Sequence, residues 1–175
     1  PSELPHRTEQ LKKLAQMFKP VFVNIGQNAF ICGPVGTGKT AMTKYFCQSL
    51  VQIARKQGKI LEYVHINCRK RSSDAMVLLG VLNHFDPRFP DRGFSVQEML
   101  EILRTHLQRK ESQLLLVLDE VDALVKKGKS NLIYTLTRFN DETTKTGNAV
   151  SVIMISQKDV LADLEAAALS TFKRS

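Results

Sequence analysis

The chain has 175 residues, the length of a single domain, and 43% of them are hydrophobic, which is enough to build a core. Its 25 Lys and Arg and 17 Asp and Glu give a net charge of +8. This charge favours polyanionic partners such as nucleic acid or nucleotide phosphates; the alternative is a basic surface that is simply solvated. No apolar run approaches the roughly 18 residues of a membrane span, and residues 1–7 lack the apolar run of a secretion signal, so we expect a soluble, cytoplasmic protein without a membrane partner.

Helical and strand-like periodicities alternate along the chain. Apolar residues at steps of three and four predict helices, and short alternating or continuously apolar runs predict strands. The predicted elements, in chain order, are a helix within residues 8–22, strand 29–32, helix 42–53, strand 60–67, helix 75–82, loop 84–94, a helix that begins at the capping-box sequence Ser95-Val96-Gln97-Glu98, strand 114–118, helix 132–139 and strand 149–155.

Four strands that alternate with helices indicate an α/β fold, a three-layer α/β/α arrangement with a mainly parallel sheet. Ligands of such sheets bind beyond the carboxyl ends of the strands. The sequence contains no repeat or interdomain linker, so we expect residues 1–175 to form one domain. Cys32, Cys47 and Cys68 are widely spaced, which argues against a disulfide framework or a zinc site.

The segment from Gly33 to Thr40 has the P-loop spacing G-x-x-x-x-G-K-T, between a predicted strand and a predicted helix. Its glycines allow bare backbone N–H groups to curl around phosphate oxygens at a helix N-terminus. Lys39 is expected to reach the β- and γ-phosphates of ATP or ADP, and the Thr40 hydroxyl to ligate Mg²⁺. The predicted nucleotide-binding residues of this segment are Gly33, Pro34, Val35, Gly36, Thr37, Gly38, Lys39, Thr40 and Ala41.

An acidic pair, Asp119-Glu120, follows the buried strand 114–118. Beside a P-loop, Asp119 is expected to hold Mg²⁺ through its water shell, and Glu120 to orient and deprotonate an attacking water. A second acid at this place favours hydrolysis over transfer to a substrate hydroxyl, and hence an ATPase over a small-molecule kinase. In isolation the pair would be read as a helix cap or a solvated turn, and Asp122 is interpreted as a helix cap.

Four segments together resemble the AAA+ ATPases of the archaeal origin-recognition and cell-division-control initiator type. They are Leu4-Pro5-His6-Arg7, the P-loop, Asn67-Cys68-Arg69 after the second strand, and Leu118-Asp119-Glu120-Val121-Asp122. The first and third are much narrower signals than the P-loop and the acidic pair. The resemblance implies a P-loop NTPase (AAA+) that binds origin duplex DNA and acts with a replicative helicase or with other initiator subunits at the nucleoid.

The resemblance also implies roles for individual residues. Leu4, Pro5, His6 and Arg7 would lie beside the adenine base, the alternative being an ordinary extended lead into a helix. Gln157 occupies the place of a polar residue, usually asparagine, that senses the γ-phosphate, so we expect it to act in catalysis with Lys39 and Glu120. The alternative is a strand-end polar residue that faces solvent.

The chain departs from the family pattern beyond Leu164. Members tend to place there an arginine that reaches the ATP of a neighbouring subunit, whereas this chain reads Glu165-Ala166-Ala167-Ala168 and offers only Lys173 and Arg174 as substitutes. The family continues with a fifth strand, a helical lid and a DNA-binding winged helix, which do not fit after Ser175. We therefore expect an incomplete sheet in which strand 29–32 is an unpaired edge.

Basic residues on two segments are candidates for contact with DNA phosphates. They are Arg69, Lys70 and Arg71 after the second strand, and Arg88 and Arg92 in the loop 84–94. In the initiators an insertion after the second strand touches duplex DNA, and the phenylalanines of this loop could wedge or stack there. Alternatively, the phenylalanines pin the loop to the core. We interpret the lysines Lys126, Lys127 and Lys129 as a solvated face. We assign no catalytic or metal-binding role to His65, His84 and His106.

Three functions remain open at this point. The first is an ATPase switch in which ATP binding and slow hydrolysis gate origin binding and helicase loading. The second is a nucleotide-gated module for binding DNA or protein, with negligible turnover. The third is an AAA+ or signalling ATPase without a role on DNA, against which the narrow initiator-like segments argue.

Overall fold

The computed structural model describes residues 7–34, 36–125, 131–143, 148–157 and 173–174. Its strands form a parallel sheet in the order β2-β3-β4-β1-β5. The strands are β1 (Asn28–Cys32), β2 (Ile60–Asn67), β3 (Ser112–Asp119), β4 (Val150–Ser156) and β5 (Lys173–Arg174). The helices are α1 (Thr8–Met17), the 3-10 helix η2 (Lys19–Val23), α2 (Lys39–Lys56), α3 (Asp74–Phe85), α4 (Val96–Lys110), α5 (Asp122–Val125) and α6 (Leu132–Thr143).

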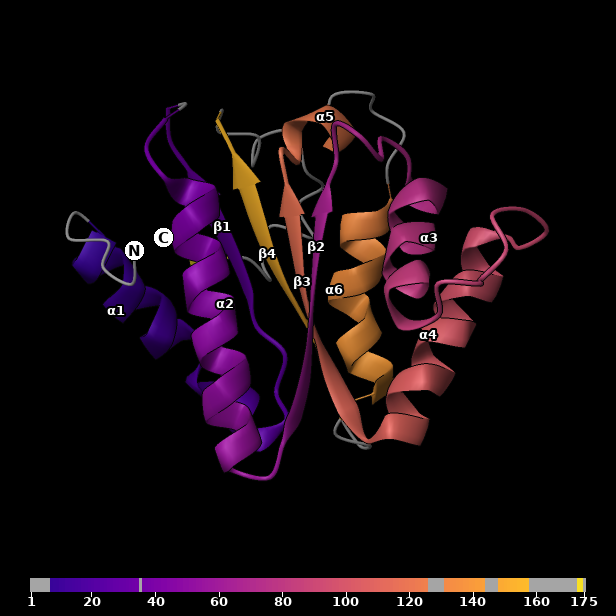
Figure 1. The fold of residues 1–175 in the computed structure, drawn as a ribbon, viewed down its shortest axis with the longest axis horizontal. Coiled ribbons are helices and arrows are strands. Elements are labelled where there is room, and N and C mark those ends of the chain that lie inside the picture. The colour runs from indigo at the N-terminus through magenta and orange to yellow at the C-terminus, as the bar shows by residue number, and fades with distance from the viewer. Residues whose placement is uncertain (1–6, 35, 126–130, 144–147, 158–172, 175) are drawn as a thin grey trace.

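Helices cover both faces of the sheet, so the three-layer α/β/α prediction is confirmed (Figure 1). Alternate residues of β3 divide between the two cores because side chains along a strand point to opposite faces. Leu115 and Val117 pack with α1, η2 and α2, whereas Leu114, Leu116 and Leu118 pack with α3, α4 and α6. Each of these side chains is almost fully buried, as expected of a strand covered on both faces.

The predicted opening helix is correct in its burial pattern but not in its continuity. Helix α1 ends at Met17, and a separate 3-10 helix carries residues 19–23. Pro20 lacks a backbone N–H and its ring clashes with the preceding turn, so the chain restarts with Pro20 at the N-terminus of the second helix. Phe18 and Val21 are nevertheless fully buried, because both helices face the same core.

Strand β1 is not the edge that the sequence predicts. The two residues of β5 pair with it in parallel, with Ala29 opposite Lys173 and Phe30 opposite Arg174. The paired backbone groups of β1 are therefore satisfied on both sides, by β4 and by β5. A two-residue strand has no periodicity, so no sequence pattern could have predicted it.

The register of the sheet brings the chemical residues to one edge. Asn67 lies opposite Asp119, and Cys32, just before the P-loop, lies opposite Ser156. The carboxyl ends of β1, β2, β3 and β4 therefore meet where Figure 1 shows the start of α2. Helix α4 begins with the predicted capping box, in which Ser95 and Glu98 bond each other's backbone N–H. None of the helices described is long and apolar enough to cross a membrane.

Candidate nucleotide-binding site

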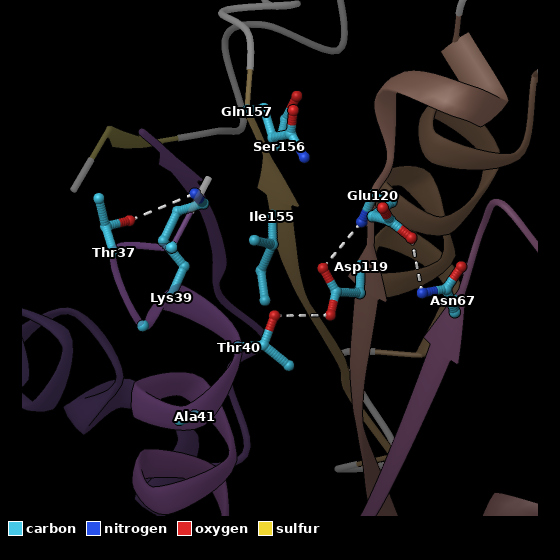
Figure 2. A pocket seen from close by; sticks show the side chains of 12 residues that line it. Thr37, Lys39, Thr40, Ala41, Asn67, Asp119, Glu120, Ile155, Ser156 and Gln157 are labelled. Carbon is cyan, nitrogen blue, oxygen red and sulfur yellow. Dashed lines mark hydrogen bonds between the residues drawn. The ribbon is translucent and has the colours of Figure 1, made fainter. Parts of the chain in front are cut away.

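A cavity of about 540 Å³ opens at the carboxyl edge of the sheet (Figure 2). Its walls come from the P-loop, the start of α2 and the ends of β2, β3 and β4. The lining residues are Gly36, Thr37, Gly38, Lys39, Thr40, Ala41, Asn67, Asp119, Glu120, Ile155, Ser156 and Gln157. Most of the predicted P-loop residues and the whole predicted catalytic set, Lys39, Glu120 and Gln157, are thus brought to one cavity.

The P-loop places the N-terminus of α2 at this cavity. Gly36 and Gly38 both have φ of 79°, a left-handed conformation that favours glycine. Gly38 is the N-cap of α2 and provides no side-chain acceptor for the first backbone N–H groups of that helix. The unpaired N–H groups and the helix dipole therefore face the cavity, an arrangement that binds anions.

The Lys39 ammonium lies within the loop. Its Nζ donates to the carbonyl oxygens of Gly33 at 2.6 Å and Pro34 at 2.7 Å, and to Thr37 Oγ1 at 3.4 Å. Lys39 is only 8% exposed, and these bonds hold its ammonium group beside the N-terminus of α2. Positive charge and backbone donors converge on the same space.

Asp119 ties β3 to the P-loop helix. Its Oδ2 accepts from Thr40 Oγ1 at 2.9 Å, and its Oδ1 accepts from the backbone N–H of Glu120 at 2.9 Å. Burial alone would raise the pKa of Asp119, but hydrogen bonds from His65 and Thr40 outweigh it and hold this pKa below its usual value. The carboxylate is therefore ionised at neutral pH.

The donor set fits a magnesium ion bound together with phosphates. Thr40 donates its hydroxyl proton to Asp119, which leaves its oxygen lone pairs for a metal, and Asp119 Oδ1 can accept from a metal-bound water. In the described ranges, no cluster of three or more His, Cys, Asp or Glu side chains could hold a metal. A magnesium ion here would complete its shell with waters and nucleotide oxygens, as it prefers to do.

Glu120 shares the cavity with Asp119 because the backbone turns between them. Successive side chains of a strand point to opposite faces, but Glu120 lies just past β3 with a left-handed φ of 51°. Asn67 Nδ2 donates to Glu120 Oε2 at 2.8 Å, and Arg69 Nε lies 3.5 Å from Glu120 Oε1. Figure 2 shows the Asn67 amide aimed at this carboxylate from the end of β2.

Other predicted nucleotide contacts lie at the margin of the cavity or outside the described residues. Gln157 is an exposed residue of the lining, directly after β4. Arg7 is the N-cap of α1, donates to the side chain of Gln10, and does not line the cavity. Leu4, Pro5, His6 and Val35 fall outside the described residues, as do the segment 165–168 and the lysines at 126, 127 and 129.

Sequence reasoning missed two residues that contact the acidic pair Asp119-Glu120. Asn67 entered only as part of a family motif, and His65 was given no chemistry, yet His65 Nε2 lies 3.1 Å from Asp119 Oδ2. Both side chains lie on one face of β2, two residues apart, and the register of β2 with β3 brings them to Asp119 and Glu120. Polar residues at period two near the end of a strand were the available signal.

The basic residues proposed for DNA contact differ in their surroundings. Arg69 faces Glu120, and Arg71 donates from its guanidinium to the carbonyl of Met76 at 3.0 Å, which ties it to α3. Lys70, Arg88 and Arg92 are exposed. The alternative reading of the loop holds for its first two phenylalanines: Phe85 and Phe89 are partly buried and pack against the core.

Comparisons with known proteins agree with this geometry. The family model described as AAA domain matches residues 26–163. The ORC1-type DNA replication protein 2 of Sulfurisphaera tokodaii is 34% identical over 158 residues, and the ORC1-type DNA replication protein of Pyrococcus abyssi is 37% identical over 161 residues; each match covers 89% of this chain and 38% of the relative. The Aeropyrum pernix ORC1 protein, solved in complex with DNA, superposes with a TM-score of 0.84 at 30% identity, over 99% of this chain and 46% of that one.

Proposed function

The chain belongs to the AAA domain family, and we propose that residues 1–175 form the ATP-binding and ATP-hydrolysing domain of a DNA replication initiator. The resemblance to archaeal initiators that the motifs suggest is confirmed by these relatives. In this role, the nucleotide state of the domain controls the binding of origin DNA and the loading of a replicative helicase. Because the chain spans 38% of the length of these relatives, the activity of the whole protein is part of the proposal.

The observation that carries the proposal is the hydrogen bond between Thr40 and Asp119. These residues are 79 positions apart, and both line the cavity at the carboxyl edge of the sheet. The bond joins a hydroxyl that can ligate Mg²⁺ to a carboxylate that can hold the water shell of that ion, next to a helix N-terminus that attracts phosphate. Each part also occurs by itself in unrelated folds, whereas their convergence in one cavity indicates binding of a nucleoside triphosphate.

Hydrolysis requires distinct tasks from the residues of the cavity. Lys39 exchanges its contacts with the loop carbonyls for the β- and γ-phosphates and stabilises the charge that develops on them. Glu120 orients and deprotonates the attacking water. Gln157, at the rim, donates to the γ-phosphate. A bound Mg²⁺ would be held by Thr40 and, through water, by Asp119, and supplies Lewis-acid stabilisation of the phosphate charge.

The test is nucleotide binding and turnover measured on the same variants. A fluorescent ATP analogue is titrated with Mg²⁺ into the wild type, Lys39→Ala and Glu120→Gln, and phosphate release is followed. We expect Lys39→Ala to weaken binding by tenfold or more, and Glu120→Gln to bind normally but hydrolyse about 100-fold more slowly. Lys44→Ala removes an exposed lysine from the same helix and is the matched control. Equal binding by Lys39→Ala and Lys44→Ala would refute the proposal.

A second candidate function, a nucleotide-gated binding module with negligible turnover, is favoured by one observation. Glu120 is engaged by Asn67 and Arg69, so its carboxylate is paired within the protein. If that pairing persists when ATP is bound, it holds the Glu120 carboxylate away from an attacking water. The same phosphate-release assay distinguishes the two functions, because under this alternative Glu120→Gln would leave the rate of phosphate release unchanged.

The proposed DNA contact rests on the exposed cations of two segments, Lys70 with Arg69 and Arg71 nearby, and Arg88 and Arg92 in the loop before α4. The Aeropyrum pernix relative solved with DNA supports assigning DNA as the ligand. Arg71 has an internal hydrogen bond, so we assign the larger part of the contact to Arg88 and Arg92. Contacts of this kind bind phosphates without reading bases.

A further inference from the structure

The Asp119 carboxylate has a second side-chain donor besides Thr40. His65 Nε2 lies 3.1 Å from Asp119 Oδ2, the same oxygen that accepts from Thr40. The His65 and Asp119 side chains are 20% and 8% exposed, so water competes little for this contact. The contact crosses from β2 to β3 on one face of the sheet, because His65 lies two residues before Asn67, the partner of Asp119 in the register.

Tyr63 lies at the other nitrogen of the His65 ring. Its Oη lies 3.3 Å from His65 Nδ1, and the two rings pack edge to face. Burial, together with the charge of Asp119, raises the pKa of Tyr63, so the phenol keeps its proton. A neutral imidazole has one donor and one acceptor. If Tyr63 donates to Nδ1, then Nε2 carries the hydrogen and donates to Asp119.

We propose that Tyr63 and His65 form a hydrogen-bond relay that positions the Asp119 carboxylate for the magnesium ion of a bound nucleotide. This inference rests on the proposed ATP-binding function. His65 acts through Asp119 and is a positioning residue, because it does not line the cavity.

The relay restricts rotation of the carboxylate. Donors from Thr40, His65 and the backbone of Glu120 approach Asp119 from α2, β2 and the end of β3. Thr40 and His65 both bond Oδ2, and the backbone N–H of Glu120 bonds Oδ1. The remaining lone pair of Oδ1 is therefore the one left to accept a hydrogen bond from a metal-bound water.

The test is a magnesium titration at a fixed concentration of fluorescent ATP analogue. Supporting residues of metal ligands contribute about 10- to 100-fold to metal affinity, so we expect His65→Leu to raise the apparent Kd for Mg²⁺ by about tenfold. Binding of the analogue in EDTA should be unchanged. A glutamine amide nitrogen reaches as far as Nε2, so His65→Gln should recover most of the loss, whereas His65→Asn should not. His84→Leu, on α3 and away from the cavity, is the matched control.

A second measurement reads the relay without nucleotide or metal. In ¹⁵N-histidine-labelled protein, we expect His65 Nε2 to be protonated and Nδ1 to be an acceptor, and Tyr63→Phe to shift this tautomer balance. A protonated Nδ1 with a bare Nε2, or an unchanged Mg²⁺ affinity in His65→Leu, would overturn the relay while leaving the ATPase proposal intact. A wild-type chain that binds no Mg²⁺-nucleotide would instead overturn the proposed function, and the positioning role with it.

Discussion

Asn67 Nδ2 donates a 2.8 Å hydrogen bond to Glu120 Oε2, and thereby joins the end of β2 to the residue proposed to activate water. The amide oxygen of the same asparagine accepts from the backbone N–H groups of Arg69 and Lys70. Asn67 is therefore connected both to the carboxylate and to the turn that carries the first group of basic residues. A change in this turn would change the position of Glu120.

We expect Asn67→Asp to raise the rate of ATP hydrolysis. Aspartate keeps an acceptor for the turn but cannot donate to Glu120, so the carboxylate is released. A hydrogen bond to a charged group contributes about 1.5–3 kcal/mol. Arg69 still pairs with Glu120 and offsets part of this loss, so the hydrolysis rate should rise by roughly tenfold in a phosphate-release assay. A rate as low as that of Glu120→Gln would mean that Asn67 supports catalysis rather than restraining it.

The sequence predicts the parts of this site whose signals are local. The P-loop, strand 114–118 and the pair Asp119-Glu120 follow from spacing and hydrophobic runs, because each depends on neighbouring residues only. The contacts of Asn67 and His65 depend instead on the register of β2 with β3, which no local pattern specifies. The left-handed conformation of Glu120 could not be predicted from the sequence either, because positive φ is uncommon for glutamate.

We expect only one of the three cysteines to react quickly with a thiol reagent at pH 8. Cys32 is exposed, whereas Cys47 and Cys68 are buried. Burial, with the nearby charges of Asp119, Asp122 and Glu120, raises the pKa of Cys68 to about 12, and burial raises that of Cys47. At pH 8 both remain protonated and unreactive, because the thiolate is the nucleophile.

The control for the thiol measurement is Cys32→Ser, which should remove the rapid phase and leave two thiols that react only in denaturant. Cys47 lies in the core on α2 and Cys68 directly follows β2. A second rapid thiol in Cys32→Ser would therefore report local opening of one of these regions, contrary to the packing described above.

We expect Gly26→Ala to destabilise the domain more than Gly80→Ala. A Cβ at Gly26 would lie 2.4 Å from the carbonyl oxygen of Val150, a backbone atom held by the Asn140 side chain. A Cβ at Gly80 would lie 2.8 Å from atoms of the Arg71 side chain, which can move. Overpacking costs about 1–3 kcal/mol, and urea unfolding should place Gly26→Ala at the upper end. The reverse order would mean that the Val150 carbonyl moves more easily than the Arg71 side chain, although Asn140 holds it.

We expect the double variant Arg88→Ala/Arg92→Ala to weaken binding of duplex DNA and to reduce its dependence on salt. Both arginines are exposed on the loop before α4, which Figure 1 shows at the opposite end of the molecule from α1. Each phosphate contact contributes about 0.9 to the slope of log K against log salt concentration, so losing both should lower that slope by roughly 1.8. Fluorescence anisotropy at several salt concentrations with Mg²⁺-ATP measures it.

The matched control is Arg55→Ala/Lys56→Ala, which removes the same charge from exposed positions at the end of α2, away from the P-loop. If the +8 net charge alone attracts DNA, both double variants should lose affinity equally, since a diffuse field does not distinguish their positions. A loss confined to Arg88 and Arg92 would locate the contact in the loop. If neither double variant changes the slope, the loop does not bind DNA. That result would leave the proposed nucleotide binding at the P-loop intact, because Phe85 and Phe89 anchor the loop to the core away from the cavity.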